Sequence, residues 1–215
     1  MTVKTVMTIK EVDKIAEAIL KESKHNRHRD HFFPLLIDKL DLQIGAEIGV
    51  DKGEFAKIIA EKSHIQRYYG IDSWLDCFGS DPKAYDPIGE NRYKAAEALL
   101  DSYITSKRIE LVKMDSELAS AQCPINLIDY LYIDGDHSLG GIFIDLKCWC
   151  PKVKIGGIIS GHDYKDGKNS GIRDFKGEQL DYGVKIVVDY WCQRYGYKLN
   201  IVGGRILSWW FYKDH

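Results

Sequence analysis

From Gly45 onward, short apolar segments alternate with segments of helical spacing, and this alternation restricts the fold more than any other feature of the sequence. Short apolar runs are typical of buried parallel strands, and the segments between them are typical of the connecting helices. The pattern therefore predicts an α/β fold, doubly wound, with helices on both faces of a mostly parallel sheet. The expected strands cover residues 46–50, 67–72, 109–114, 129–134 and 156–161, and the expected helices cover 54–62, 90–104, 116–121, 139–149 and 184–195.

The last two apolar segments break this alternation. KLNIV (198–202) and LSWWFYK (207–213) are separated only by Gly203, Gly204, Arg205 and Ile206. Because this gap is too short for the crossover that parallel strands need, we expect an antiparallel hairpin. A series of strand–helix units that closes with a hairpin argues against a plain dinucleotide-binding fold of six parallel strands.

The first 43 residues precede the alternating pattern and are expected to form a helical cap on it. Thr8 and Glu11 have the spacing of a capping box, and apolar residues follow them at helical spacing. A second short helix is expected from about Phe33 to Leu40, with Pro34 in its first turn. The length of 215 residues suits a single domain, 1–215, with a cap (1–43) and a Rossmann-like core (44–215).

The charge balance excludes several classes of partner. The 30 basic and 32 acidic residues are spread along the chain, so no electrostatic footprint for nucleic acid or an anionic membrane emerges. The sequence has neither an apolar stretch approaching the ~20 residues of a membrane span nor a signal peptide at its N-terminus. We therefore expect a soluble, cytoplasmic protein with a small-molecule partner, and a homo-oligomer is compatible with these data. The basic run KHNRHR (24–29) is a candidate substrate contact.

The first expected strand leads into a glycine turn, AEIGVDKGEF (46–55), which is typical of a nucleotide-like ligand at a helix N-terminus. The spacing of Gly49 and Gly53 fits neither the dinucleotide fingerprint nor the P-loop. Glu47 and Asp51 would repel a pyrophosphate at this position, whereas they would attract a ligand that carries an ammonium and a sulfonium. S-adenosylmethionine is such a ligand, and we predict that these four residues contribute to its binding.

The ends of the next two expected strands extend this cofactor site. Asp72 ends the second strand, where an acidic residue can accept hydrogen bonds from ribose hydroxyls, and Ser73 and Trp74 follow it directly. Asp115 and Ser116 end the third strand at a position suited to the adenine edge. All five are predicted cofactor-binding residues. Two long polar segments, Ser73 to Gly89 and Lys165 to Gly183, leave the same edge of the sheet and are expected to be lids or binding loops.

The fourth and fifth strands end in YIDGDHS (132–138) and GGIISGHDY (156–164). Because adjacent strand ends face the same crevice, Asp134 should lie near His162 and Asp163. Two carboxylates and one imidazole suit Mg²⁺ or Mn²⁺, so these three residues are the predicted metal ligands, and Asp134 is also expected to contact the cofactor. His137 is the candidate general base. Asp136 can orient that imidazole or act as the base itself, and the sequence does not choose between these roles.

The chain from about Gly45 to its end resembles the class I S-adenosylmethionine-dependent methyltransferases. The resemblance rests on E-x-G-x-x-x-G at Glu47 to Gly53, the acidic end of the second strand at Asp72, and the closing hairpin. It implies a seven-stranded sheet of order 3-2-1-4-5-7-6 with strand 7 antiparallel. The first 40 residues take no part in the match.

The segments around Asp134 and Asp163 are similar to those of metal-dependent small-molecule O-methyltransferases, including the catechol type and the sugar O-methyltransferases. Those enzymes usually carry Asp at the position of His162. The run from YIDGDHS to SGHDY also resembles a broad methyltransferase group often encoded beside glycan-building genes. The resemblance implies transfer of a methyl group to a hydroxyl of a small polar acceptor, a sugar or glycan, with a divalent cation. Aromatic side chains of the loops and the final hairpin could stack on the acceptor, although core and surface packing explains most of them; they are Trp74, Phe78, Tyr85, Tyr164, Trp209 and Trp210.

Two other functions compete with this one. A metal-dependent glycosyltransferase would use Asp134-Gly135-Asp136 as a DxD motif for Mn²⁺ and a sugar diphosphate, but this leaves the acidic first turn unexplained. A catalytically idle module that only binds S-adenosylmethionine would serve as a partner subunit. The clustered carboxylates argue against that module, because such groups are costly without a cation or partner.

Overall fold

Seven strands form one sheet in the order β3-β2-β1-β4-β5-β7-β6, which confirms the order that the resemblance implied. The computed structural model describes residues 6–23, 28–75, 87–165, 182–203 and 206–215. Both expected binding loops lie mostly outside these ranges. The strands are β1 (Ile44–Ile48), β2 (Arg67–Asp72), β3 (Ile109–Lys113), β4 (Ile128–Ile133), β5 (Val153–Gly161), β6 (Asn200–Gly203) and β7 (Leu207–Tyr212).

The strand directions place the carboxyl ends of the first five strands at one edge of the sheet. The pairs β1–β2, β1–β4, β2–β3 and β4–β5 are parallel. Strand β7 pairs antiparallel with both β5 and β6, which confirms the expected hairpin. Since β1 lies between β2 and β4, the turn after β1 has the ends of both neighbours beside it, as expected for the switch point of an open α/β sheet.

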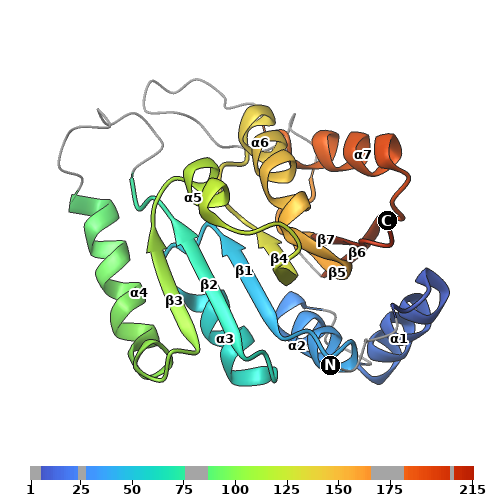
Figure 1. Cartoon of the computed structure of the whole chain (residues 1–215), viewed down its shortest axis with the longest axis horizontal. Coiled ribbons are helices and arrows are strands. Elements are labelled where there is room, and N and C mark those ends of the chain that lie inside the picture. Colours follow the sequence, from blue (N-terminus) through green and yellow to red (C-terminus); the bar gives the residue numbers. More distant parts are fainter. Residues whose placement is uncertain (1–5, 24–27, 76–86, 166–181, 204–205) are drawn as a thin grey trace.

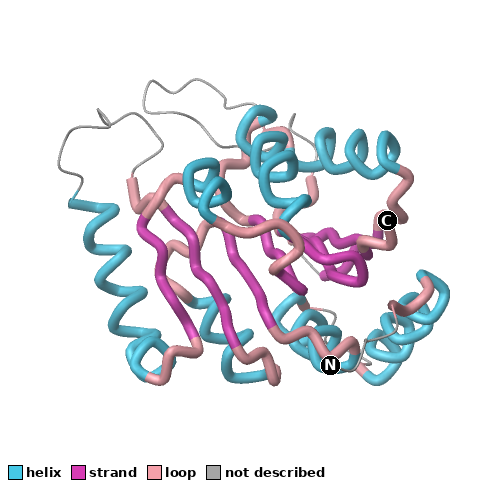
Figure 2. The backbone as a smooth tube through the Cα atoms, in the orientation of Figure 1, coloured by secondary structure: helices cyan, strands magenta, loops and turns pink. Residues whose placement is uncertain are grey.

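Helices cover both faces of the sheet (Figures 1 and 2). One face packs against α1 (Ile9–Glu22), α2 (Arg29–Lys39), α3 (Glu54–Lys62) and α4 (Pro87–Thr105). The other face packs against α5 (Ser116–Gln122), α6 (Leu139–Trp149) and α7 (Val184–Tyr195). Side chains alternate across each strand, so Ala46 and Ile48 of β1 belong to the second core while Tyr130 and Tyr132 of β4 belong to the first. No helix of the described ranges has both the length and the apolar character to cross a membrane.

The N-terminal helices pack into the first core, and they differ from expectation at one end. The capping box of Thr8 and Glu11 is formed, as predicted. Helix α2 begins at Arg29, four residues earlier than expected, so Pro34 lies inside the helix and not in its first turn. Proline inside a helix removes one backbone hydrogen bond. The buried side chains of Phe33 and Leu36 on this helix explain why tertiary packing outweighs that local cost.

Candidate functional site

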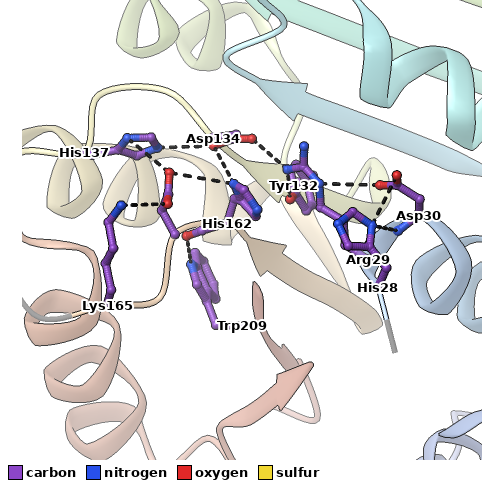
Figure 3. Close-up of polar contacts among 10 residues, drawn as sticks. His28, Arg29, Asp30, Tyr132, Asp134, His137, His162, Lys165 and Trp209 are labelled. Atoms are coloured by element: carbon purple, nitrogen blue, oxygen red, sulfur yellow. Dashed lines mark hydrogen bonds and ion pairs between the residues drawn. The ribbon is translucent and has the colours of Figure 1, made fainter. Parts of the chain in front are cut away.

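The ends of β4 and β5 bring together two carboxylates and two imidazoles, as the sequence predicted for three of the four (Figure 3). Asp134 Oδ1 lies 3.2 Å from His137 Nε2 and 3.7 Å from His162 Nδ1. Asp163 Oδ2 lies 3.7 Å from the Nδ1 atoms of both histidines. All four side chains are mostly shielded from solvent, with exposed fractions between 13% and 25%. We call these four residues the acid–histidine cluster.

Backbone contacts between neighbouring strands fix this cluster. The amide of Asp134 donates to the Ile48 carbonyl over 2.7 Å, and the amide of His162 donates to the Ile133 carbonyl over 3.2 Å. The indole of Trp209, on β7, donates to the His162 carbonyl. Asp163 adopts a left-handed backbone conformation with φ of 54°, which turns the chain out of β5.

Two basic side chains pair with the two carboxylates of the cluster. Arg29 Nη1, from the first residue of α2, donates to Asp134 Oδ2 over 2.9 Å, and Lys165 Nζ lies 3.2 Å from Asp163 Oδ1 (Figure 3). Each carboxylate therefore points one oxygen at a basic side chain and the other toward the histidines. The sequence analysis singled out the basic run that ends at Arg29, but nothing in it pointed to Asp134 as the partner.

Aromatic rings surround the Arg29 guanidinium. Its Cζ lies 4.8 Å from the centroid of Phe55 and 5.6 Å from that of Tyr132. Nη1 also donates to the Tyr132 hydroxyl over 2.6 Å. Burial lowers the pKa of Arg29, but Tyr132 and Asp134 outweigh it and the net pKa is raised. The side chain is therefore a permanent cation held by stacking and hydrogen bonds.

Protonation within the cluster follows from these contacts. Burial opposes ionisation of Asp134, but the hydrogen bond from His137 and the charges of His162 and Arg29 bring its pKa below the usual value. Burial also opposes protonation of His137, yet Asp134 and Asp163 raise its pKa. Burial lowers the pKa of His162, so this imidazole favours the neutral form that ligates metals. The two histidines are thus tuned in opposite directions.

The predicted metal ligands fit a hard divalent cation. Asp134, His162 and Asp163 each offer one ligand atom, and these atoms all lie within 4.8 Å of one another. Ligand atoms around Mg²⁺ lie at about 2.1 Å from the ion, so a modest contraction of this group would complete three positions of an octahedron. Two carboxylate oxygens and one neutral imidazole are a suitable donor set for Mg²⁺ or Mn²⁺.

Asp136 does not join the cluster. Its Oδ1 accepts from the Ser138 amide and its Oδ2 from the Ser138 hydroxyl, both over 2.9 Å. The carboxylate is thereby held at the N-terminus of α6, where Ser138 is the N-cap. A DxD site would need Asp134 and Asp136 on one cation, and this arrangement gives no support to the glycosyltransferase alternative.

Tyr182 forms a wall beside the cluster that the sequence analysis did not identify. It is 3% exposed, and its ring centroid lies 5.2 Å from that of His137. Its backbone pairs with Ser138, and the amide of Gly183 donates to the His137 carbonyl over 2.8 Å. The segment that begins at Tyr182 therefore packs directly against the turn after β4.

The turn after β1 has the close approach that its glycines require. A side chain at Gly49 would place Cβ 2.2 Å from the Asp134 carbonyl oxygen, and Gly49 has φ of 86°. Asp72 ends β2 as expected, and its Oδ2 accepts from the amides of Val50 and Asp51 over 2.9 and 3.0 Å. The Asp51 side chain is exposed, and its Oδ1 lies 3.6 Å from Nη1 of Arg92. Asp72 therefore shapes the turn that was predicted to hold the cofactor.

The other predicted residues of the first turn are less accessible. Gly53 has φ of 83° and is the N-cap of α3, where Leu100 leaves no room for a side chain. Glu47 is 2% exposed, and its Oε2 makes no hydrogen bond to any described residue. Burial raises the pKa of Glu47 well above the usual value, and the charge of Asp134 adds to this. Burial of this carboxyl group thus opposes the charged form on which its predicted role in cofactor binding was based.

The predicted residues after β2 and β3 have structural partners. Trp74 is 2% exposed, and its indole donates to the Asp51 carbonyl over 2.8 Å, while Ser73 is only partly buried. Asp115 is the N-cap of α5. The Ser116 hydroxyl donates to Asp145, on α6. All four line the turns where the cofactor was expected, and their contacts fix the conformation of those turns.

Asp145 is a further buried acid that the sequence analysis missed. It is 3% exposed, and burial raises its pKa to about 6, with added effects from the charges of Asp136 and Asp115. The sequence could have indicated this buried acid, because Asp145 shares helical spacing with the apolar residues Ile142 and Trp149, which are buried.

Most of the aromatic residues considered for stacking on an acceptor are structural. Trp209 and Trp210 are 0% and 3% exposed and belong to opposite cores. Tyr164 is half-buried and its hydroxyl donates to Asp189. Phe78 and Tyr85 lie outside the described residues. Both tryptophans of the hairpin fill the core, as the packing interpretation expected, and they are not available for stacking on an acceptor.

Comparisons with known proteins concern the family and the fold of this chain. Residues 46–164 match a family model described as a methyltransferase domain. The fold resembles that of a protein assigned as a caffeoyl-CoA O-methyltransferase from Staphylococcus aureus, with a TM-score of 0.64, 14% identity, and coverage of 92% of this chain and 91% of that one. A protein assigned as an O-methyltransferase from Klebsiella pneumoniae has a TM-score of 0.62 and 13% sequence identity, and the match covers 97% of this chain and 92% of that one.

Proteins with other chemistry share the fold. Spermidine synthase from Thermotoga maritima gives a TM-score of 0.55 and 11% identity, covering 85% of this chain and 60% of that one. At such identities the likeness shows the fold alone. A search of curated protein sequences finds no match.

Proposed function

Because the chain belongs to the methyltransferase family whose domain residues 46–164 match, it is an S-adenosylmethionine-dependent methyltransferase, and we propose that it methylates a hydroxyl group. The proposed acceptor is a small polar molecule, a sugar or glycan, and the proposed site is the acid–histidine cluster. The single observation that carries the proposal is the meeting of Asp134, His137, His162 and Asp163 beside the turn after β1.

A divalent cation, Mg²⁺ or Mn²⁺, is part of the proposal. Asp134, His162 and Asp163 would hold it, and their spacing is the support for this assignment. When bound, such a cation lowers the pKa of a hydroxyl group and orients it for attack. Arg29 and Lys165 would keep one oxygen of each carboxylate engaged, which fixes the direction of the other oxygen.

The proton balance of the reaction assigns a role to His137. The acceptor oxygen forms a bond to the methyl carbon, the bond from that carbon to sulfur breaks, and S-adenosylhomocysteine leaves. The hydroxyl proton must go to a nearby base. His137 is favoured over Asp136, because its imidazole lies between Asp134 and Asp163, which stabilise the protonated form, whereas both Asp136 oxygens already accept from Ser138.

The polar acceptor is supported by the lining of the site. Carboxylates, imidazoles and the Lys165 ammonium dominate the cluster, and Tyr182 supplies one aromatic wall. Hydroxyl-rich acceptors suit such a surface, since each donor or acceptor can be matched. The methyl acceptor named for the S. aureus protein, caffeoyl-CoA, belongs to that protein. Both it and the K. pneumoniae protein carry the O-methyltransferase description, which agrees with a hydroxyl acceptor.

Calorimetric titration with S-adenosylmethionine, NAD and a UDP-sugar tests the first step. We expect binding of S-adenosylmethionine only. Binding of the UDP-sugar alone would refute the methyltransferase function and restore the glycosyltransferase alternative.

Methyl transfer to a panel of sugars and catechols, followed with and without EDTA, tests the cation. We expect EDTA to abolish methyl transfer and added Mg²⁺ or Mn²⁺ to restore it. In Asp163→Ala, the added cation should no longer restore activity. The matched control is Glu117→Ala, which removes an exposed carboxylate from the first turn of α5, at the same edge of the sheet, without touching the proposed ligands. Full activity of Asp163→Ala in EDTA would show that no cation takes part.

The base is tested with the same assay. We expect His137→Ala to reduce turnover by about 10²- to 10⁴-fold while the affinity for S-adenosylmethionine stays unchanged. Unchanged turnover in His137→Ala with a large loss in Asp136→Ala would transfer the role to Asp136.

A further inference from the structure

The charge pattern at the cofactor edge leaves one part of S-adenosylmethionine without a partner. The ligand carries an ammonium, a sulfonium and a single negative group, its α-carboxylate. The turns at this edge carry Asp51, Asp72 and Asp134, so the carboxylate would face like charges unless a cation lies beside it. These three acids therefore require a positively charged side chain near the bound carboxylate.

The position of the carboxylate follows from the order of the strands. The predicted placement of the cofactor puts adenine at the end of β3 and ribose at Asp72 on β2. From this predicted placement, the order of the strands directs the methionine part of the ligand across β1 toward β4. The α-carboxylate would then lie near the end of β4 on the side of α2. Arg29 is at this position, because it contacts Asp134 directly after β4 and stacks near Tyr132 within β4.

The guanidinium of Arg29 can bind a further anion beside Asp134 and Asp30, because one of its nitrogens has no partner among the described residues. Its two hydrogen bonds to described residues, to Asp134 and Tyr132, both leave from Nη1. Nη2 has no hydrogen bond to a described residue, and 21% of the side chain remains exposed. Two aromatic rings and two ion pairs hold the group in place: Nη1 pairs with Asp134, and Nε lies 3.5 Å from Asp30 Oδ1. A planar guanidinium so fixed can bind a carboxylate with little loss of side-chain freedom.

We propose that Arg29 binds the α-carboxylate of S-adenosylmethionine through the Nη2 side of its guanidinium, while Nη1 keeps its contact with Asp134. The N-terminal cap thereby becomes part of the cofactor site. Arg29 lies outside residues 46–164, so this contact would come from outside the region that matches the methyltransferase domain. The proposal depends on neither the acceptor nor the divalent cation.

Two other basic residues at this edge fit the role less well. Arg92, on α4, faces Asp51 over 3.6 Å, on the side of the turn away from β4. Lys165 faces Asp163 at the end of β5, one strand further along the sheet. Arg92 makes the better control, because it is also an arginine paired with an acid, and its substitution removes the same charge from the same edge.

The test is a titration of the whole chain, in buffer with EDTA, with two ligands that differ in one group. S-adenosylmethionine carries the carboxylate, and decarboxylated S-adenosylmethionine retains the amine, the sulfonium and the adenosine. We expect Arg29→Gln to raise the Kd of S-adenosylmethionine about 10- to 100-fold, as for loss of a charge-assisted hydrogen bond, and to change that of the decarboxylated ligand less than about 3-fold. Arg29→Lys should give an intermediate loss, because it keeps the charge without the planar group.

The outcomes separate a ligand contact from a structural role. Equal weakening of both ligands by Arg29→Gln would mean that Arg29 only supports the fold of the site, and the proposal would fail. Unchanged affinity for both ligands would also overturn it, as would a selective loss in Arg92→Gln. Retained binding of the decarboxylated ligand shows that the variant is folded, and loss confined to S-adenosylmethionine confirms the contact.

Discussion

Asp145 links a single buried carboxyl group to the pH dependence of stability. Its pKa is raised to about 6 by burial, whereas an unfolded chain releases this proton near 3.8. Between these pH values the folded protein holds more protons than the unfolded chain, so stability falls as pH rises. Above about pH 6 the cost of the buried charge is complete.

Asp145→Asn should therefore stabilise the protein above pH 6. The amide can still accept from Ser116, and the substitution removes a buried charge that costs about 3 kcal/mol of stability. Urea unfolding at pH 5 and pH 8 measures this, with a gain expected at pH 8 that shrinks at pH 5. A gain of equal size at both values would contradict the account, since a pH-independent effect cannot arise from this ionisation.

Gly49→Ala should disrupt the cofactor edge. The new Cβ would lie 2.2 Å from the Asp134 carbonyl oxygen, and φ of 86° is unfavourable for alanine. We expect a loss of about 2 kcal/mol or more in the free energy of unfolding and a large loss of S-adenosylmethionine affinity. Gly140→Ala is the control, because nothing lies within 4 Å of a Cβ there. If Gly49→Ala bound the cofactor normally, the close approach of β1 and β4 would have no role in binding.

At the scale of elements, the sequence predicted the sheet and its hairpin, but it placed the starts of α2, α4 and β5 three or four residues too late. Strand and helix alternation is a local pattern, so β2, α3 and α7 have the predicted bounds. The start of α2 was missed because Pro34 gives a strong local signal, whereas the packing of Phe33 depends on residues far along the chain. Contacts between residues that are distant in the sequence produce no periodic pattern from which they could be predicted.

The capping box of α1 provides a test confined to one element. Thr8 accepts from the Glu11 amide, and its own amide donates to the Glu11 carboxylate over 2.7 Å. Thr8→Ala should lower the free energy of unfolding by about 1 kcal/mol, measured by urea unfolding. Lys10→Ala, an exposed change in the same turn, should have little effect. Equal effects of the two substitutions would show that the cap contributes nothing to stability.

For the whole molecule, the acid–histidine cluster was predictable in part. Asp134, His162 and Asp163 could be placed together because adjacent strands end at one edge. Arg29 could not be placed, since 105 residues separate it from Asp134 and only the packing of α2 brings them together. The sheet also divides the interior into two cores, one on each face.

These two cores should contribute independently to one cooperative unit. Leu36, on α2, and Leu146, on α6, are both 0% exposed and lie on opposite faces. Each change to alanine should cost about 2 to 5 kcal/mol, and the double variant should show the sum within about 0.5 kcal/mol. Unfolding followed by tryptophan fluorescence and by circular dichroism should give one midpoint. Separate midpoints would mean that the faces unfold separately.

The left-handed backbone conformations at the sheet edge imply a trade-off between thermal stability and activity. Asp51, Trp74 and Asp163 have φ of 49°, 48° and 54° in the turns after β1, β2 and β5. Selection for heat resistance would favour glycine at such positions, because glycine adopts this conformation freely. Asp163→Gly should therefore raise the melting temperature and abolish binding of Mn²⁺. A variant that had a higher melting temperature and still bound Mn²⁺ would exclude the trade-off. A thermostable descendant of this chain would have to acquire its stability away from the turns that perform its chemistry.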